Sequence, residues 1–138
     1  MFTRILVPTD FSASADAALA LARTHFPDAQ RCLLHVIDPQ RLASTAMSSV
    51  SAGDDRRAFE GTIAARLQEL VVEGEEYAVR VGPASDTIID KARAWEADLI
   101  VMGTHGRTGL AHFLNGSVAE QVVRHARMPV LIEHERKE

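Results

Sequence analysis

The chain has a single cysteine, Cys32, and no apolar run long enough to cross a membrane. A lone cysteine cannot form an internal disulfide, and its place in an apolar stretch predicts a small buried core side chain, not a redox centre. A membrane helix needs about 20 apolar residues, and the N-terminus has no signal-peptide pattern. We therefore expect a cytoplasmic protein without a membrane partner.

The chain also lacks a large excess of either positive or negative charge. The formal net charge is −4, and like charges occur only in short runs. This balance argues against nucleic acid or an anionic membrane as the main partner. With 46% hydrophobic and 25% charged residues over 138 positions, the chain has the composition and size of one globular domain, residues 1–138.

Several catalytic motifs are missing. The sequence contains no G-x-x-x-x-G-K-[ST] of a P-loop NTPase, no G-x-G-x-x-G after an apolar strand and no G-x-S-x-G elbow. The six histidines show no H-x-x-x-H spacing, and there is no C-x-x-C pair, so we predict no metal ion held by the protein alone. No general base or nucleophile can be identified, and the sequence does not predict an enzyme.

Short apolar runs alternate with helical apolar periods along the chain. The runs predict strands over residues 3–8, 32–37, 77–81, 98–103 and 129–133. The periods predict helices from Ser12 or Ser14 to about His25, over 59–71, from Ser85 or Asp86 to Trp95, and over 117–126. Residues 40–57 have no clean period and are predicted to form a surface loop. This βαβαβαβαβ order predicts an α/β fold with one doubly wound, five-stranded parallel sheet and four helices.

A glycine-rich stretch follows the fourth predicted strand. It contains Gly103, Gly106 and Gly116, and Ser117 then opens a helical pattern. Glycines let backbone N–H groups approach a ligand closely, and a helix N-terminus offers free donors, so this order predicts a phosphate-binding loop. Two alternatives stay open: the glycines can simply permit turns, and Ser117-x-x-Glu120 can be a helix capping box.

Three polar residues near these glycines are further candidates. Asp10 ends the first strand, where it could hydrogen-bond a nucleoside or orient a divalent metal on phosphates, or simply form a turn before Ser12. His105 and Arg107 lie within the glycine stretch and can donate to phosphate oxygens. The alternative for both is that they are solvated loop residues.

The spacing Gly103-x2-Gly106-x9-Gly116-Ser117 resembles the ATP-binding motif of the universal stress protein family, G-x2-G-x9-G-[S/T]. Three further regions are similar to that family, namely residues 4–10, residues 34–38, and residues 116–120 with 129–132. The resemblance covers the chain except for about residues 40–57. Four separated motifs in the right order are much more specific than one glycine pattern.

The resemblance implies the strand order 3-2-1-4-5 of a Rossmann-like, adenine nucleotide α-hydrolase-like fold. In that order the chain switches direction between the first and fourth strands, and ligands of such sheets bind at the carboxyl ends of the strands there. It further implies that Pro8 and Thr9 lie beside the nucleoside and Val36 against the adenine, with Met102 and Val118 lining the pocket. From the pattern alone, the last three would be ordinary core residues.

The last predicted strand, 129–133, would lie at an edge of this sheet. It is apolar and has no edge protection in its middle. The resemblance implies a homodimer in which two such strands pair antiparallel. A monomer whose edge is guarded by Pro129 and the charged tail stays open as the alternative.

Together these features predict an ATP-binding regulatory or sensor protein of the stress response, with Mg²⁺ carried on the phosphates. An unknown protein partner would read the nucleotide-bound state. Two alternatives stay open. One is a slow ATPase or autokinase, for which the chain offers no identifiable base, and the other is a dimeric interaction module that does not bind nucleotide.

Overall fold

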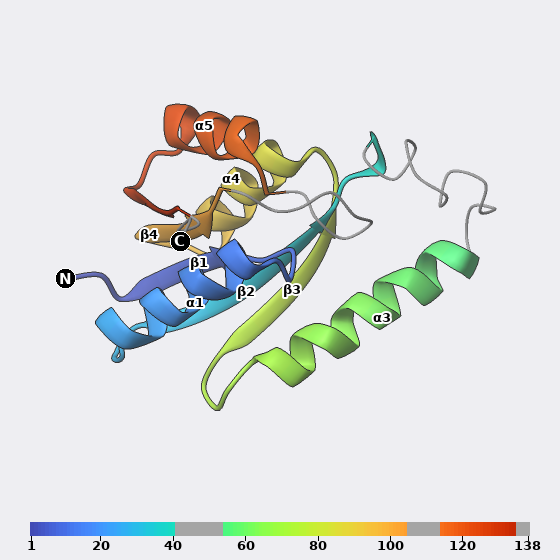
Figure 1. Cartoon of the computed structure of the whole chain (residues 1–138), viewed down its shortest axis with the longest axis horizontal. Coiled ribbons are helices and arrows are strands. Elements are labelled where there is room, and N and C mark those ends of the chain that lie inside the picture. Colours follow the sequence, from blue (N-terminus) through green and yellow to red (C-terminus); the bar gives the residue numbers. More distant parts are fainter. Residues whose placement is uncertain (41–53, 105–113, 135–138) are drawn as a thin grey trace.

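Five parallel strands form one sheet in the order β3-β2-β1-β4-β5 (Figure 1), in a computed structural model that describes residues 1–40, 54–104 and 114–134. The strands are β1 (Arg4–Pro8), β2 (Gln30–Ile37), β3 (Glu76–Val81), β4 (Leu99–Gly103) and β5 (Val130–Glu133). The helices are α1 (Ala13–His25), α3 (Asp54–Leu70), α4 (Ala84–Ala94) and α5 (Gly116–His125). The predicted α/β fold and the strand order implied by the resemblance are both confirmed.

Each face of the sheet has its own core. Successive side chains of a strand point to opposite faces, so Ile5 and Val7 pack with residues of α1 and α3, whereas Leu6 packs with residues of α4 and α5. Figure 1 shows the two pairs of helices on opposite sides of the sheet. Cys32 is buried in the core on the α4 and α5 side, as predicted. This double cover explains why the central strands are apolar along nearly their whole length.

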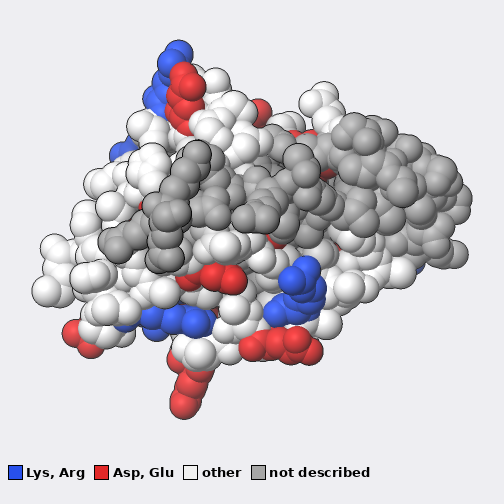
Figure 2. Space-filling model, viewed as in Figure 1, with Lys and Arg blue, Asp and Glu red and all other residues white. Residues whose placement is uncertain are grey.

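Acidic and basic side chains are interspersed over the surface shown in Figure 2. On that face the described residues form no extended area of one charge. Within the described ranges, no helix combines the length and the apolar character that crossing a membrane requires.

One carboxylate ties the amino ends of β1 and β4 together. Asp98, directly before β4, accepts from the backbone N–H groups of Thr3 at 2.9 Å and Arg4 at 3.0 Å. In return, the Asp98 N–H donates to the Arg4 carbonyl at 2.8 Å. These bonds support a register in which Leu6 lies beside Ile100. The carboxyl ends of the two strands therefore come out at the same edge of the sheet.

The N-terminal caps of α1 and α4 lie at the carboxyl ends of the strands. Ser12, one of the two predicted candidates, caps α1 by accepting from a first-turn N–H at 3.3 Å. The prediction for α4 was wrong, because the helix starts at Ala84, before both Ser85 and Asp86, and no side chain of its own caps it. Instead Asp38, which follows β2, accepts from the Ala84 N–H at 3.2 Å. That cap is contributed from 46 residues away.

The capping box that the sequence left open as an alternative for α5 does not form. The cap is Asn115, whose side-chain oxygen accepts from the Val118 N–H at 3.0 Å. Ser117 is already inside the helix, and its hydroxyl donates to the same Asn115 oxygen at 2.7 Å. Glu120 pairs with Arg124 one turn later instead of reaching back to the cap.

The predicted loop over residues 40–57 needs one correction. α3 begins at Asp54, so the last four residues of that range are helical. The apolar period used for the prediction begins only at Phe59 and Ile63, which pack against the core, because residues 54–57 are all Asp or Arg and carry no apolar signal. Residues 41–53 lie outside the described part.

A buried carboxylate joins α1, β2 and the chain after α3. Glu75 has a side chain only 1% exposed, and it pairs with Arg23 and Arg31 at 2.6 Å each. The Val72 N–H donates to it as well, at 3.0 Å. Burial raises the pKa of Glu75, but the hydrogen bonds from both arginines and from Val72 outweigh it and lower the pKa to about 2.

We predict that Glu75 makes stability depend on pH in the acidic range. Because its pKa falls from 4.5 to about 2 on folding, its contribution is complete above pH 4.5 and is lost as the pH approaches 2. Replacing Glu75 by Gln should reduce the unfolding free energy at neutral pH by about 3 kcal/mol, because two arginines lose their partner. Denaturant melts between neutral pH and pH 2 check this, with exposed Glu73→Gln as the control. A Glu75→Gln variant as stable as the parent at neutral pH would contradict it.

Candidate functional site

The carboxyl ends of β1 and β4 meet where the strand order reverses. Thr9 and Asp10 follow β1 at this point, while Gly103 ends β4 and Thr104 follows it. All four residues are buried. The Thr9 N–H donates to the Leu34 carbonyl of β2 at 2.8 Å, which extends the strand pairing by one step. The structure thus brings together the segments Pro8-Thr9-Asp10 and Met102-Gly103, as the resemblance implies.

An aromatic stack holds the turn between β1 and α1. Phe11 has a φ of +64°, a left-handed conformation that is uncommon for a bulky side chain. Its ring stacks on His35 with centroids 5.2 Å apart, and the Arg66 guanidinium of α3 lies over the ring at 4.0 Å. His35 Nδ1 donates to the Thr9 carbonyl at 2.9 Å. The turn is therefore fastened to both β2 and α3.

Asp10 is fully buried and bonded to the protein itself. One carboxylate oxygen accepts from the Ser12 N–H at 3.1 Å, and the other accepts from the Leu114 N–H at 2.9 Å. The first bond is the turn contact that the sequence left open as an alternative. The second joins the end of β1 to the residue that precedes the cap of α5, and no sequence signal indicated it.

The two described glycines of the motif differ in their surroundings. A Cβ on Gly103 would lie 2.6 Å from the Ser14 carbonyl oxygen, so this glycine is required where β4 packs against the first turn of α1. Gly116 is exposed, and a Cβ there would meet nothing within 4 Å. Packing among the described residues explains the first glycine and leaves the second without a structural reason.

The N-terminus of α5 faces outward beside this junction. Gly116 and Ser117 are its first two residues, and both are exposed. The first N–H groups of a helix have no partner within the helix, and the helix dipole makes this end positive. Asn115 satisfies the N–H of Val118. This end of α5 has the donors and the polarity that an anion needs.

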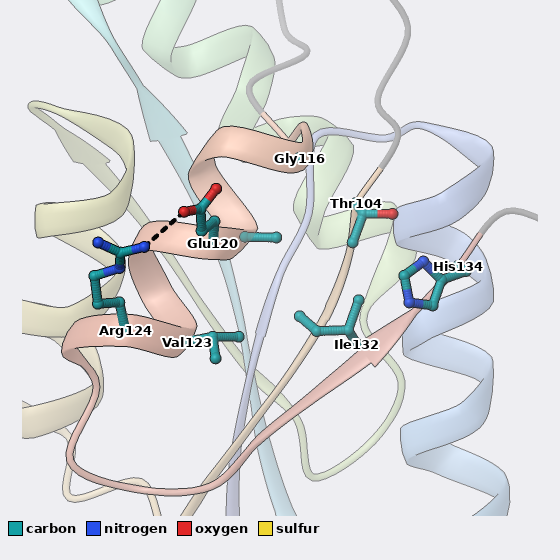
Figure 3. A pocket seen from close by; sticks show the side chains of 8 residues that line it. Thr104, Gly116, Glu120, Val123, Arg124, Ile132 and His134 are labelled. Atoms are coloured by element: carbon teal, nitrogen blue, oxygen red, sulfur yellow. Dashed lines mark hydrogen bonds and ion pairs between the residues drawn. The ribbon is translucent and has the colours of Figure 1, made fainter.

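A groove of about 500 Å³ runs from this point along α5 to β5 (Figure 3). Thr104 and Gly116 lie at one end, and Ile132 and His134 form the β5 side. The remaining lining residues come from α5: Ala119, Glu120, Val123 and Arg124. Sequence reasoning missed this groove, because its two sides are built from segments whose pairing only the fold decides.

Three residues that the resemblance assigned to the pocket are core residues here. Val36, Met102 and Val118 are 1%, 0% and 5% exposed, and they belong to the same cluster between the sheet and the pair α4 and α5. Their side chains pack against protein. Through this shared cluster, the carboxyl ends of β2 and β4 pack together with the first turn of α5.

Other predicted residues lie outside the described part of the chain, namely His105, Gly106 and Arg107. Among residues 1–40, 54–104 and 114–134, no group of three or more His, Cys, Asp or Glu side chains is arranged to hold a metal ion. A divalent ion at this junction would therefore depend on ligands from a bound phosphate.

Residues 1–134 match the model of the universal stress protein family. The chain belongs to the universal stress protein family. Two relatives from Methanocaldococcus jannaschii, the universal stress proteins MJ0531 and MJ0577, are 33% and 30% identical to it. Each alignment covers 96% of this chain, with 82% of MJ0531 and 94% of MJ0577.

Solved structures of universal stress proteins share the whole architecture. The structure of MJ0577 matches with a TM-score of 0.75 at 29% identity, over 100% of this chain and 99% of that one. A universal stress protein in complex with cAMP matches with a TM-score of 0.57 at 24% identity, over 98% and 99% of the two chains. A universal stress protein family protein from Arabidopsis thaliana with AMP bound matches with a TM-score of 0.58 at 21% identity, over 97% of this chain and 92% of that one. The last two likenesses concern the fold.

We predict that alanine at Gly103 lowers the free energy of unfolding, whereas alanine at Gly116 does not. Gly103→Ala should lower the unfolding free energy by about 3 kcal/mol, because its Cβ would clash with the Ser14 backbone. Gly116→Ala should leave it unchanged or raise it by up to about 1 kcal/mol, because the space is open and alanine restricts the unfolded chain. Chemical denaturation of both variants without nucleotide checks this. Equal destabilisation would contradict it.

Proposed function

We propose that this universal stress protein binds ATP, with Mg²⁺ on the phosphates, where the carboxyl ends of β1 and β4 meet the N-terminus of α5. The observation that carries the proposal is Gly116. It occupies the first position of a helix, it is exposed, and nothing among the described residues requires a glycine there. Gly61 within α3 is equally open, so what distinguishes Gly116 is its place at the start of α5, where the absence of a side chain would let a ligand approach the free N–H groups of the helix closely.

The surroundings of Gly116 suit a phosphate group. The free N–H groups and positive end of α5 attract an anion, and the exposed Ser117 hydroxyl lies one residue further on. The motif residues Gly106, His105 and Arg107 would add backbone and side-chain donors, and this part of the proposal rests on sequence alone. The nucleoside would lie toward Pro8 and Thr9.

Relatives of the same fold support an adenine nucleotide as the ligand. One structure contains cAMP and another AMP, in proteins 24% and 21% identical to this chain. They support the class of ligand, whereas ATP in particular is our inference from the resemblance of the glycine motif to the ATP-binding motif of the family. The bound nucleotide would act as a signal in a stress response, and a protein partner would recognise the occupied state.

We also propose that two copies pair through β5. This strand lies at the edge of the sheet and its Leu131 is exposed, while its Ile132 lines the groove together with Val123 of α5 (Figure 3). An open apolar edge strand favours pairing with another strand. A second copy of β5 would cover the edge and one side of the groove.

The nucleotide proposal predicts that freshly purified protein, once denatured, releases ATP that mass spectrometry can identify. A Gly116→Val variant should release none and should bind ATP at least about tenfold more weakly in titrations, because its side chain fills the approach to α5. Its affinity for adenosine should stay close to that of the parent.

Gly61→Val is the matched control, because Gly61 is also an exposed helical glycine with nothing within 4 Å of a Cβ. It should bind ATP like the parent. Equal affinity of the parent for ATP and adenosine would remove the phosphate part of the proposal. No binding of any adenine nucleotide by the parent would overturn all of it and favour an interaction module.

The dimer proposal predicts that the parent sediments as a dimer and that Leu131→Lys shifts it toward a monomer, because a charge at the paired edge opposes association. Val72→Lys is the control, since Val72 is 48% exposed and lies after α3, away from β5. Analytical ultracentrifugation over a range of concentrations distinguishes the species. A parent that stays monomeric throughout would contradict the proposal.

A further inference from the structure

Two described segments contact the turn between β1 and α1: one ends at Thr104 and the other begins at Leu114. In the first segment, Gly103 packs so closely on Ser14 that no Cβ fits between them. In the second segment, the Leu114 N–H donates to the Asp10 carboxylate at 2.9 Å. Asp10 and Ser14 are linked through Ser12, whose N–H donates to Asp10 and whose hydroxyl lies 3.4 Å from that of Ser14.

We infer that Asp10 is a positioning residue of the proposed nucleotide site, which fixes the N-terminus of α5 relative to β1 and does not itself contact the ligand. The existence of a nucleotide site rests on the proposed function, whereas the fixing of α5 rests on the contact between Asp10 and Leu114. This positioning role differs from the role that the sequence suggested for Asp10, which was a direct contact to a nucleoside or to a metal on the phosphates.

The burial of Asp10 favours this role. Its side chain is 0% exposed, and each of its two oxygens already accepts one backbone N–H. Because the side chain has no exposed surface, a ligand atom or a metal ion could reach the carboxylate only if the surrounding protein atoms moved. Losing either N–H bond in such a movement would leave a buried N–H group unsatisfied, which is costly for the fold.

The bond to Leu114 has a direct consequence for α5. Leu114 is 1% exposed and packs in the core on the α4 and α5 side, so both its backbone and its side chain are held. The next residue, Asn115, is the cap of α5, and Gly116 begins the helix. The position of the proposed phosphate-binding backbone is thus set two residues away from the Asp10 bond. The Ser12 bond, by contrast, is local to the turn.

The variant Asp10→Ala tests the inference. It removes both carboxylate oxygens, so the N–H groups of Ser12 and Leu114 both lose their acceptor, whereas the amide oxygen of Asp10→Asn could still accept from Leu114. In nucleotide-free protein, the amide of Leu114 should exchange with solvent at least about tenfold faster than in the parent, because the protecting bond is lost. Exchange at Leu33 and Leu34 in β2 should stay close to the parent rate.

Asp98→Ala is the matched control. Like Asp10, Asp98 accepts from two backbone N–H groups, those of Thr3 and Arg4, but it lies at the opposite end of the sheet. This variant should lose stability without changing Leu114 exchange or nucleotide affinity. It separates a general weakening of the fold from a local effect at α5.

Nucleotide titrations then address the site. In Asp10→Ala, the ratio of ATP affinity to adenosine affinity should fall about tenfold, to the same extent with and without Mg²⁺, because the misplaced part is the phosphate end. Unchanged Leu114 exchange would overturn the inference. A loss of affinity seen only with Mg²⁺ would also overturn it, because it would make Asp10 a metal ligand. If the parent binds no nucleotide, the proposed function fails, while the exchange measurement still decides whether Asp10 holds α5.

Discussion

The structure depends on the central position of β1. This strand pairs with β2 on one side and β4 on the other, and the chain crosses from one half of the sheet to the other at this strand. Because parallel strands need crossover helices, α1 and α3 cover one face and α4 and α5 the other, which buries β1 from Ile5 to Pro8. Asp98 holds the amino ends of β1 and β4 together, so their carboxyl ends open at a common edge. The candidate site is a consequence of that arrangement.

Two carboxylates with the same chemistry stabilise the two ends of this junction. Asp98 at the amino end and Asp10 at the carboxyl end each accept two backbone N–H groups. Asp98 joins neighbouring strands, whereas Asp10 joins a strand to the beginning of a helix through Leu114. The distinction matters for function, since a displacement at Asp98 changes strand register, while a displacement at Asp10 would move the helix end proposed to bind phosphate.

The glycines of one motif have different physical reasons. Gly103 is needed by the fold, because it lets β4 approach the backbone of α1. Gly116 is not explained by any contact among the described residues, and a ligand would explain it. The sequence pattern treats the two alike. Only their surroundings separate a packing requirement from a binding one, and that separation is the strongest support for the proposed nucleotide site.

The sequence by itself determined the alternation of strands and helices, the burial of Cys32 and the family, because apolar periodicity and short motifs are local properties of the chain. The strand order followed from the family resemblance. The tertiary structure alone decided that Asn115 and not Ser117 caps α5, that Asp38 caps α4, and that Asp10 binds the Leu114 N–H. The Asp38 and Asp10 contacts join residues 46 and 104 positions apart. The Asn115 cap is local, but Ser117 offered an equally good pattern, and only the packing of α5 selects between them.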